Sequence, residues 1–310
     1  MKTKAMLSVL AGIVIGACGM FAVSSETEVQ LSDAVVENRV ETEIYSPKVE
    51  PAMYMGVDEI RTVNVGGVDR TYRVHVPDGQ LYTDNVVPVV FVAHYYHGTA
   101  EKMQKVTGFN DVKAVVVYLQ GVDNAWAPAP YAKTSSEEDL VYFDAVQKEI
   151  SREYLVSRES TFIAGFSNGG GFAMYVRCNR PNAVGGVATV SAAFYDDVLQ
   201  GCAALPVKQI DIHGDNDSIL SYAGGTRYKH SYWGVDDVMR EVAGFNSCIA
   251  YVDESVSVGR VRRWNACVAD LEQVKIDGGG HDWGAVSKND SSPSFATGEI
   301  VEFFGLDFVG

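Results

Sequence analysis

Hydrophobic and polar residues alternate most clearly near the start of the folded part of the chain. Residues 61–76 switch between apolar and polar side chains on either side of Gly66 and Gly67, which predicts a β-hairpin. Residues 86–93 and 112–118 are instead almost continuously apolar. Such runs are typical of strands that are buried on both faces of a sheet. The pattern therefore predicts a hairpin followed by central strands of a covered sheet.

Helical spacing follows between residues 137 and 154, where Leu140, Phe143, Val146 and Ile150 lie on one face of the predicted helix. We expect further strands at residues 161–164, at 186–190, in the run that ends at His213, and before His281. We expect further helices after the 161–164 strand, near 232–242 and at 297–304. Strands that alternate with helices predict an α/β fold, with a mostly parallel sheet and helices on both faces.

The N-terminal residues do not follow this pattern. Lys2 and Lys4 precede an apolar run at residues 6–17, and small residues follow, so residues 1–24 are typical of a signal peptide. An alternative is a lipoprotein signal that ends before Cys18, which would leave Cys18 lipidated and the protein on a membrane. Residues 25–55 predict an acidic linker. Residues 56–310 are then one folded domain, in a secreted or periplasmic protein.

The charge and length of the chain exclude some classes of protein function. The chain has 310 residues, a net charge of −15 and 47% hydrophobic residues, enough for one large domain with a substantial core. The excess of acid argues against binding to nucleic acid or to an anionic membrane surface. No Cys-x-x-Cys motif or histidine cluster suggests a metal, and no Gly-rich loop suggests a nucleotide cofactor.

Four cysteines follow Cys18, and an even number in an exported chain suggests two disulfides. They are Cys178, Cys202, Cys248 and Cys267. Three pairings are possible. We favour the sequential one, which joins Cys178 to Cys202 and Cys248 to Cys267, because each bond then closes a short loop.

The most informative segment is Gly165-Phe166-Ser167-Asn168-Gly169, between an apolar strand and an apolar stretch that can be helical. This setting is typical of a nucleophile elbow, in which a strained turn presents a serine hydroxyl above a sheet. A Cβ at Gly165 or Gly169 would collide with a neighbouring element. The alternative is a Gly-rich turn whose serine only caps a helix.

Two downstream residues complete a possible catalytic triad in the chain order Ser, Asp, His. Asp217 follows the predicted strand that ends at His213, and it is our choice for the acid, with Asp215 as the rival. Either acid could instead only hydrogen-bond its own turn. His281 follows three glycines, which leave room for an imidazole, whereas His230 lies in a polar segment without such a loop.

An oxyanion hole would need two backbone N–H groups. We expect one from Asn168, directly after the serine, and the other from Tyr96, in the loop after the 86–93 strand. Tyr95, Trp126 and Trp283 are candidates for an aromatic wall that binds substrate. Aromatic residues at such positions also often pack in the core.

Several separated blocks together resemble a known family. They are Arg70-Thr71-Tyr72, Val76-Pro77, 88–94, Asn124-Ala125-Trp126, Glu138-Asp139, 165–170, Cys178 with Pro181, 213–217, Cys248, Cys267 and 278–283. Over residues 62–304 the chain resembles the secreted α/β-hydrolase esterases known as polyhydroxybutyrate depolymerase-like, or as feruloyl and acetylxylan esterases of the first carbohydrate esterase family. In that family the acid lies three residues after the Gly of a His-Gly turn, which corresponds to Asp217.

The resemblance implies a serine carboxylester hydrolase that forms an acyl-enzyme and acts on feruloyl or acetyl groups of plant polysaccharide. A short-chain polyhydroxyalkanoate depolymerase is the alternative; a serine peptidase or a non-catalytic surface protein of the same fold are further ones. Two positions depart from the family. His94 is followed by Tyr95 rather than Gly, and a shifted register would make Thr99 the donor in place of Tyr96. Trp283 is followed by Gly284 and Ala285 rather than by Pro-Gly.

Overall fold

A computed structural model describes residues 53–54, 56–80, 86–284 and 294–310. These residues belong to one compact unit, Lys48–Gly310. The expected signal peptide at 1–24, its lipoprotein alternative at Cys18 and nearly all of the expected linker at 25–55 lie outside the described residues. Those boundaries therefore stay predictions.

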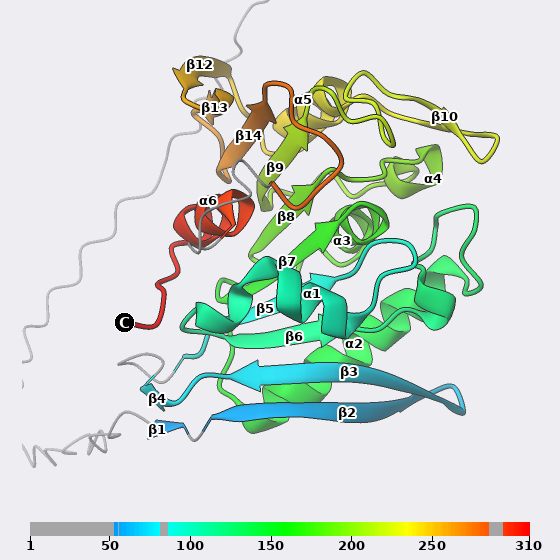
Figure 1. Ribbon diagram of the computed structural model, residues 1–310, viewed down its shortest axis with the longest axis vertical. Coiled ribbons are helices and arrows are strands. Elements are labelled where there is room, and N and C mark those ends of the chain that lie inside the picture. The colour runs from blue at the N-terminus through cyan, green and yellow to red at the C-terminus, as the bar shows by residue number, and fades with distance from the viewer. Residues whose placement is uncertain (1–52, 55, 81–85, 285–293) are drawn as a thin grey trace, which may run out of the picture. The chain divides into compact units, whose positions relative to one another are not determined.

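The main sheet of the described residues has ten strands in the order β12-β13-β14-β9-β8-β7-β5-β6-β3-β2 (Figure 1). From β14 to β6 each neighbouring pair is parallel, and the pairs at both edges are antiparallel. The strands are β2 Val57–Val65, β3 Val68–Val76, β5 Val89–Ala93, β6 Val115–Leu119, β7 Thr161–Phe166, β8 Gly186–Val190, β9 Lys208–Gly214, β12 Ala250–Val256, β13 Gly259–Asn265 and β14 Leu271–Ile276. The predicted α/β fold with a mostly parallel central sheet is confirmed.

Two short antiparallel pairs lie outside this sheet. They join β1 (Met53–Tyr54) to β4 (Gly79–Gln80) and β10 (Gly225–Arg227) to β11 (His230–Tyr232). The helices are α1 Ala100–Thr107, α2 Ser136–Glu153, α3 Asn168–Asn179, α4 Asp196–Leu199, α5 Val235–Phe245 and α6 Phe295–Phe304, with 3₁₀ turns η1 Phe109–Asp111 and η2 Val122–Asn124.

The apolar run of β5 is buried on both faces, as its sequence predicts. Val89 and Phe91 pack into a core cluster with the buried residues of α2 and part of α3. Val90 and Val92 point the other way, into a cluster with α1 and α6. Alternate side chains thus have cores on opposite sides, which is why the run is continuously apolar.

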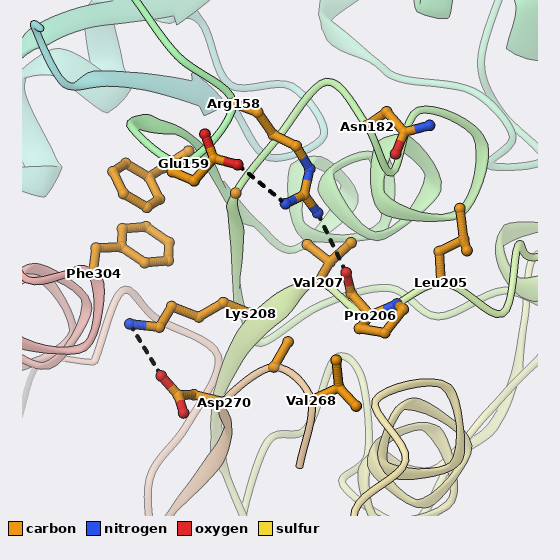
Figure 2. A pocket seen from close by; sticks show the side chains of 13 residues that line it. Arg158, Glu159, Asn182, Leu205, Pro206, Val207, Lys208, Val268, Asp270 and Phe304 are labelled. Carbon is orange, nitrogen blue, oxygen red and sulfur yellow. Dashed lines mark hydrogen bonds and ion pairs between the residues drawn. The ribbon is translucent and has the colours of Figure 1, made fainter. Parts of the chain in front are cut away.

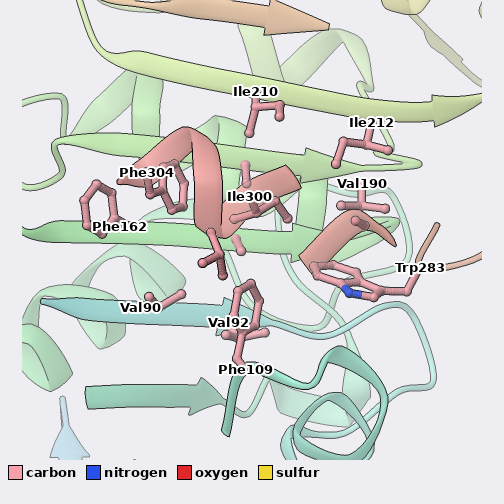
Figure 3. Close-up of a cluster of buried hydrophobic side chains, with 14 of the residues drawn as sticks. Val90, Val92, Phe109, Phe162, Val190, Ile210, Ile212, Trp283, Ile300 and Phe304 are labelled. Carbon is pink, nitrogen blue, oxygen red and sulfur yellow. The ribbon is translucent and has the colours of Figure 1, made fainter. Parts of the chain in front are cut away.

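Figure 3 shows the second of these clusters, where Ile300 and Phe304 of α6 lie over the strands. Trp283 is part of the same cluster, at the end near Phe109. Because Trp283 follows His281 by two residues, its packing anchors the chain just after that histidine.

Both disulfides have the sequential pairing. Cys178 at the end of α3 is bonded to Cys202, and Cys248 after α5 is bonded to Cys267 before β14. The predicted connectivity is therefore confirmed. Each bond closes a loop between residues 24 or 19 positions apart, next to the strands that carry the candidate acid and histidine.

Candidate active site

Ser167 occupies a strained turn between β7 and α3. Its backbone has φ 56° and ψ −116°, a region that costs a non-glycine residue on the order of 1–3 kcal/mol. The turn is packed so tightly that a Cβ on Gly165 would overlap the Gly169 carbonyl, and one on Gly169 would overlap the Ala93 carbonyl. The amide of Ser167 donates to the Val190 carbonyl at 2.9 Å. The glycines thus permit a close approach of strand, turn and helix, which holds Ser167 at the carboxyl end of the central strand β7.

Three side chains converge at this edge. His281 Nε2 lies 2.9 Å from Ser167 Oγ, and His281 Nδ1 lies 2.7 Å from Asp217 Oδ2. Ser167 follows β7, Asp217 follows β9, and His281 follows β14, so all three come after the carboxyl ends of parallel strands. The geometry permits His281 to accept the serine proton at Nε2 while Nδ1–H donates to the carboxylate.

Asp217 is held as a carboxylate. Its Oδ1 accepts the backbone N–H groups of Ile219 and Leu220, both at 2.8 Å. Burial by itself would raise the pKa of Asp217, but hydrogen bonds from His213, His281 and the Leu220 amide outweigh it and hold that pKa well below its usual range. The acid therefore stays ionised while it orients the histidine.

The rival residues lie elsewhere. Asp215 accepts the Gly278 amide at 2.6 Å and Lys275 Nζ at 3.1 Å, so its carboxylate ties down the start of the Gly-rich loop. His230 is exposed on β11. Neither residue contacts Ser167 or His281 among the interactions of the described residues.

The amide of Asn168 is available for an oxyanion. Asn168 is the first residue of α3, so its N–H has no partner within the helix and lies at the positive end of the helix dipole. Its side chain clamps the neighbouring loop: Oδ1 accepts the Trp126 N–H at 2.8 Å, and Nδ2 donates to the Trp126 carbonyl at 2.9 Å. In the described part of the chain, the N–H of Tyr96 also has no hydrogen-bond acceptor.

His94 holds the loop that carries Tyr96. Burial lowers the pKa of His94 to about 4, so the ring is neutral at pH 7. Its Nε2 accepts the Gly121 N–H at 2.9 Å, which leaves the hydrogen on Nδ1, 2.8 Å from the Tyr95 carbonyl. The loop therefore keeps a fixed course with Tyr95 at the position where the resemblance led us to expect a glycine.

The prediction that three aromatic residues line the substrate site is wrong for two of them, Trp126 and Trp283. Trp126 is fully buried, stacks on Phe172 with ring centroids 4.7 Å apart, and donates from Nε1 to the His94 carbonyl. Trp283 is also buried and donates from Nε1 to Thr297 Oγ1 at 2.9 Å. Both indoles find their hydrogen-bond partners inside the core, so neither faces substrate. Tyr95 is half-buried and packs edge to face on Phe166, with ring centroids 5.3 Å apart.

A cluster of other tyrosines lies on the loops around the site, and sequence reasoning missed most of it. Tyr96 stacks on Tyr131 with ring centroids 3.9 Å apart. The centroid of Tyr131 lies 4.9 Å from that of Tyr228 and 6.2 Å from that of Tyr195. Tyr232 meets Tyr195 at 6.2 Å. We call Tyr96, Tyr131, Tyr195, Tyr228 and Tyr232 the tyrosine cluster. Four of these five residues were missed as site residues because their loops are far apart in the chain.

A surface hollow of about 660 Å³ lies at the amino-terminal ends of several parallel strands, and Figure 2 shows its lining from close by. It is lined by residues that begin or precede strands, including Phe162 of β7, Lys208 of β9 and Asp270 before β14. Its charged side chains are paired, as Figure 2 shows for Arg158 with Glu159 and for Lys208 with Asp270. This hollow is separate from the Ser167 site.

No helix in the described ranges is long and apolar enough to cross a membrane. The same residues contain no group of three or more His, Cys, Asp or Glu side chains arranged to hold a metal ion.

Comparison with known proteins gives one family model and several relatives. The model described as phospholipase/carboxylesterase matches residues 132–240, which include Ser167 and Asp217 but end before His281. Feruloyl esterase C of Emericella nidulans is 25% identical over 265 residues, 81% of this chain and 88% of that protein. Feruloyl esterase D of Neurospora crassa is 27% identical over 191 residues, 55% of this chain and 61% of that protein. Matches to three of the relatives cover only 50% to 66% of the relatives' length.

Solved structures share the fold at low identity. The fluorophosphonate-binding serine hydrolase F of Staphylococcus aureus has a TM-score of 0.52 at 14% identity, covering 81% of this chain and 99% of that one. A CE1 ferulic acid esterase of Anaeromyces mucronatus has a TM-score of 0.51 at 14% identity, covering 91% and 99%. The chain therefore has the α/β-hydrolase fold. The curated relatives that it resembles include feruloyl esterases, at 25% and 27% identity.

Proposed function

We propose that this protein is a serine carboxylesterase. The observation that carries the proposal is the hydrogen-bonded series from Ser167 Oγ to His281 at 2.9 Å and from His281 to Asp217 at 2.7 Å, on a strained elbow. Nucleophilic catalysis by serine needs this arrangement, because a hydroxyl is a weak nucleophile until a base removes its proton. The esterase relatives support the same reaction class.

Each residue then has a defined step. His281 Nε2 takes the proton as Ser167 Oγ attacks the ester carbonyl carbon, and the N–H groups of Asn168 and Tyr96 stabilise the negative oxygen that forms. The alcohol leaves with the proton from His281, and an acyl-enzyme remains. Water then attacks the acyl carbon and gives a proton to His281; as the acid is released, His281 returns that proton to Ser167 Oγ. Asp217 keeps Nδ1–H of His281 oriented and stabilises the imidazolium.

We propose an aryl-substituted acyl group, such as feruloyl on plant polysaccharide, as the substrate. The tyrosine cluster supports this choice, because its accessible members offer flat apolar faces with hydroxyl groups that suit a phenolic acid, while the buried Tyr195 packs beneath them. The feruloyl esterase relatives support it as well. The two disulfides support action in an oxidising compartment outside the cytoplasm, in line with the expected signal peptide.

A panel of esters tests both parts of the proposal. Purified protein is assayed on methyl ferulate, p-nitrophenyl acetate and a short-chain polyhydroxyalkanoate, with Ser167→Ala as the control. We expect turnover of the first two that is lost in Ser167→Ala, with the higher kcat/KM on methyl ferulate. Full activity of Ser167→Ala would rule out the mechanism. Turnover of the polyester alone would contradict the aryl substrate and favour a depolymerase.

A further inference from the structure

β9 has one apolar and one polar face, although both are buried. Ile210 and Ile212 point into the cluster beneath α6, whereas Gln209, Asp211 and His213 alternate with them on the other face. Burying a polar group is costly unless hydrogen bonds compensate it. His213 ends this row, four residues before Asp217 and almost wholly buried. The hydrogen-bond partners of His213 can therefore affect the position of Asp217.

The protonation of His213 can be read from one contact. Its Nε2 lies 2.9 Å from the backbone carbonyl oxygen of Leu220. A carbonyl oxygen only accepts hydrogen bonds, so Nε2 carries a hydrogen. The same nitrogen lies 3.3 Å from Oδ2 of Asp217. His213 therefore directs one N–H at both the Leu220 carbonyl and the carboxylate.

That contact completes the surroundings of Asp217. Oδ1 accepts two backbone N–H groups, from Ile219 and Leu220, and Oδ2 accepts from His281 at 2.7 Å and faces His213 at 3.3 Å. An ionised carboxylate has about four acceptor positions, so all are used. Rotation of the carboxylate would break at least one of these contacts.

Leu220 is held at both ends of its backbone as well. Its N–H donates to Asp217 Oδ1 at 2.8 Å, and its carbonyl accepts from His213. The histidine thus links the end of β9 to the turn that presents the acid. Behind it, Asp211 accepts a hydrogen bond from Thr189 at 2.6 Å, and the ring of Tyr222 meets that of His213 edge to face at 5.8 Å.

We propose that His213 is a positioning residue for the catalytic acid, which rests on the proposed function. Through Nε2–H it holds Asp217 Oδ2 and the Leu220 carbonyl together, so that the carboxylate remains aligned with Nδ1 of His281. His213 does not touch the reacting atoms. Its effect is on how often Asp217 and His281 are correctly placed, which changes kcat rather than KM.

The test compares His213→Gln with His213→Asn. The side-chain amide of glutamine reaches about the position of Nε2, whereas the shorter amide of asparagine does not. We expect kcat on p-nitrophenyl acetate to fall about 10- to 100-fold in His213→Asn with KM unchanged. His213→Gln is expected to remain within about 5-fold of wild type. Gln209→Leu is the matched control: it alters the same buried face away from Asp217, and we expect an unchanged kcat.

The outcomes separate the two proposals. Equal kcat values for His213→Gln and His213→Asn, at comparable melting temperatures, would overturn the positioning role. A fall in kcat for Gln209→Leu as large as that for His213→Asn would also overturn it, because general loosening would then explain the effect. Wild-type protein without ester turnover would instead contradict the proposed function. His213→Leu, which removes the donor altogether, should match His213→Asn or fall below it.

Discussion

Asn168 and Trp126 form a reciprocal pair, in which the side-chain amide of Asn168 binds both the N–H and the carbonyl of Trp126 at 2.8 and 2.9 Å. The residue after the candidate nucleophile is thereby fixed to the loop that leads into α2. That loop is also anchored by Asp139, which accepts from the Ala127 N–H and forms a buried ion pair with Arg70. The backbone N–H of Asn168, which we expect to bind the oxyanion, is therefore positioned by a loop outside α3 as well as by α3 itself.

This pair predicts a measurable loss in Asn168→Ala. The buried N–H of Trp126 would lose its partner, which costs about 1–3 kcal/mol, and the Trp126 carbonyl would keep only the longer bond from the Ala129 N–H at 3.3 Å. We expect lower stability in urea unfolding and a kcat reduced about 10-fold, since the Asn168 N–H remains but its placement loosens. Unchanged stability would show that the pair does not hold the loop.

The elbow glycines predict a sharper effect. In Gly165→Ala and Gly169→Ala the added methyl group would overlap backbone carbonyls that cannot move without shifting β5 or α3. We expect loss of soluble folded protein, or folded protein without activity. Gly244→Ala is the matched control, because Gly244 lies in α5 with open space where a Cβ would be. That control should gain about 0.5–1 kcal/mol of stability. A fully active Gly169→Ala would contradict the tight turn.

Asp211 predicts a pH dependence of stability. Burial raises the pKa of Asp211 to about 6, so the folded protein keeps this proton at pH values where the unfolded chain has lost it. Stability from this group is therefore highest below about pH 4, falls as the pH rises to about 6 and then levels off. Asp211→Asn should remove this dependence, seen as a smaller difference between urea midpoints at pH 4.5 and 7.5. An equal difference in both proteins would show that Asp211 is already ionised in the folded protein at pH 4.5.

The tyrosine cluster predicts a change in substrate preference. Tyr228 is exposed and meets Tyr131 with its ring. Tyr228→Ala should raise KM for methyl ferulate about 10-fold, and by much less for p-nitrophenyl acetate, because only the larger acyl group gains from an aromatic contact. Tyr251→Ala, an exposed tyrosine on β12, should change neither KM. Equal KM changes for both esters would show that the tyrosine cluster does not recognise the acyl group.

The sequence predicted the central sheet well, because β5 and β7 carry continuous apolar runs that only a doubly covered strand requires. It did not predict β12 or β13. β12 is exposed along nearly its whole length, and its side chains form ion pairs with β13, such as Asp253 with Arg262. Because β12 has no buried face, its sequence does not alternate between apolar and polar residues. α1 was also missed, since only Ala100 and Met103 give it an apolar side.

The candidate site was predictable to a different degree at each position. The order of Ser167, Asp217 and His281 along the chain, with glycines around the first and last, indicated residues that the fold brings within hydrogen-bonding distance. The directions of Trp126 and Trp283 could not be predicted, because an indole after a strand can face either the core or the solvent. His213 was missed because its role depends on the turn at Leu220, which brings its carbonyl back to the ring.

The most direct test of the central claim is labelling with a fluorophosphonate, followed by mapping of the modified residue by mass spectrometry. We expect one adduct per chain on Ser167, none in Ser167→Ala, and labelling slowed at least 100-fold in His281→Ala, since the base that activates the hydroxyl is then absent. No adduct on the folded wild type, an adduct on another serine, or equal labelling rates with and without His281 would contradict it.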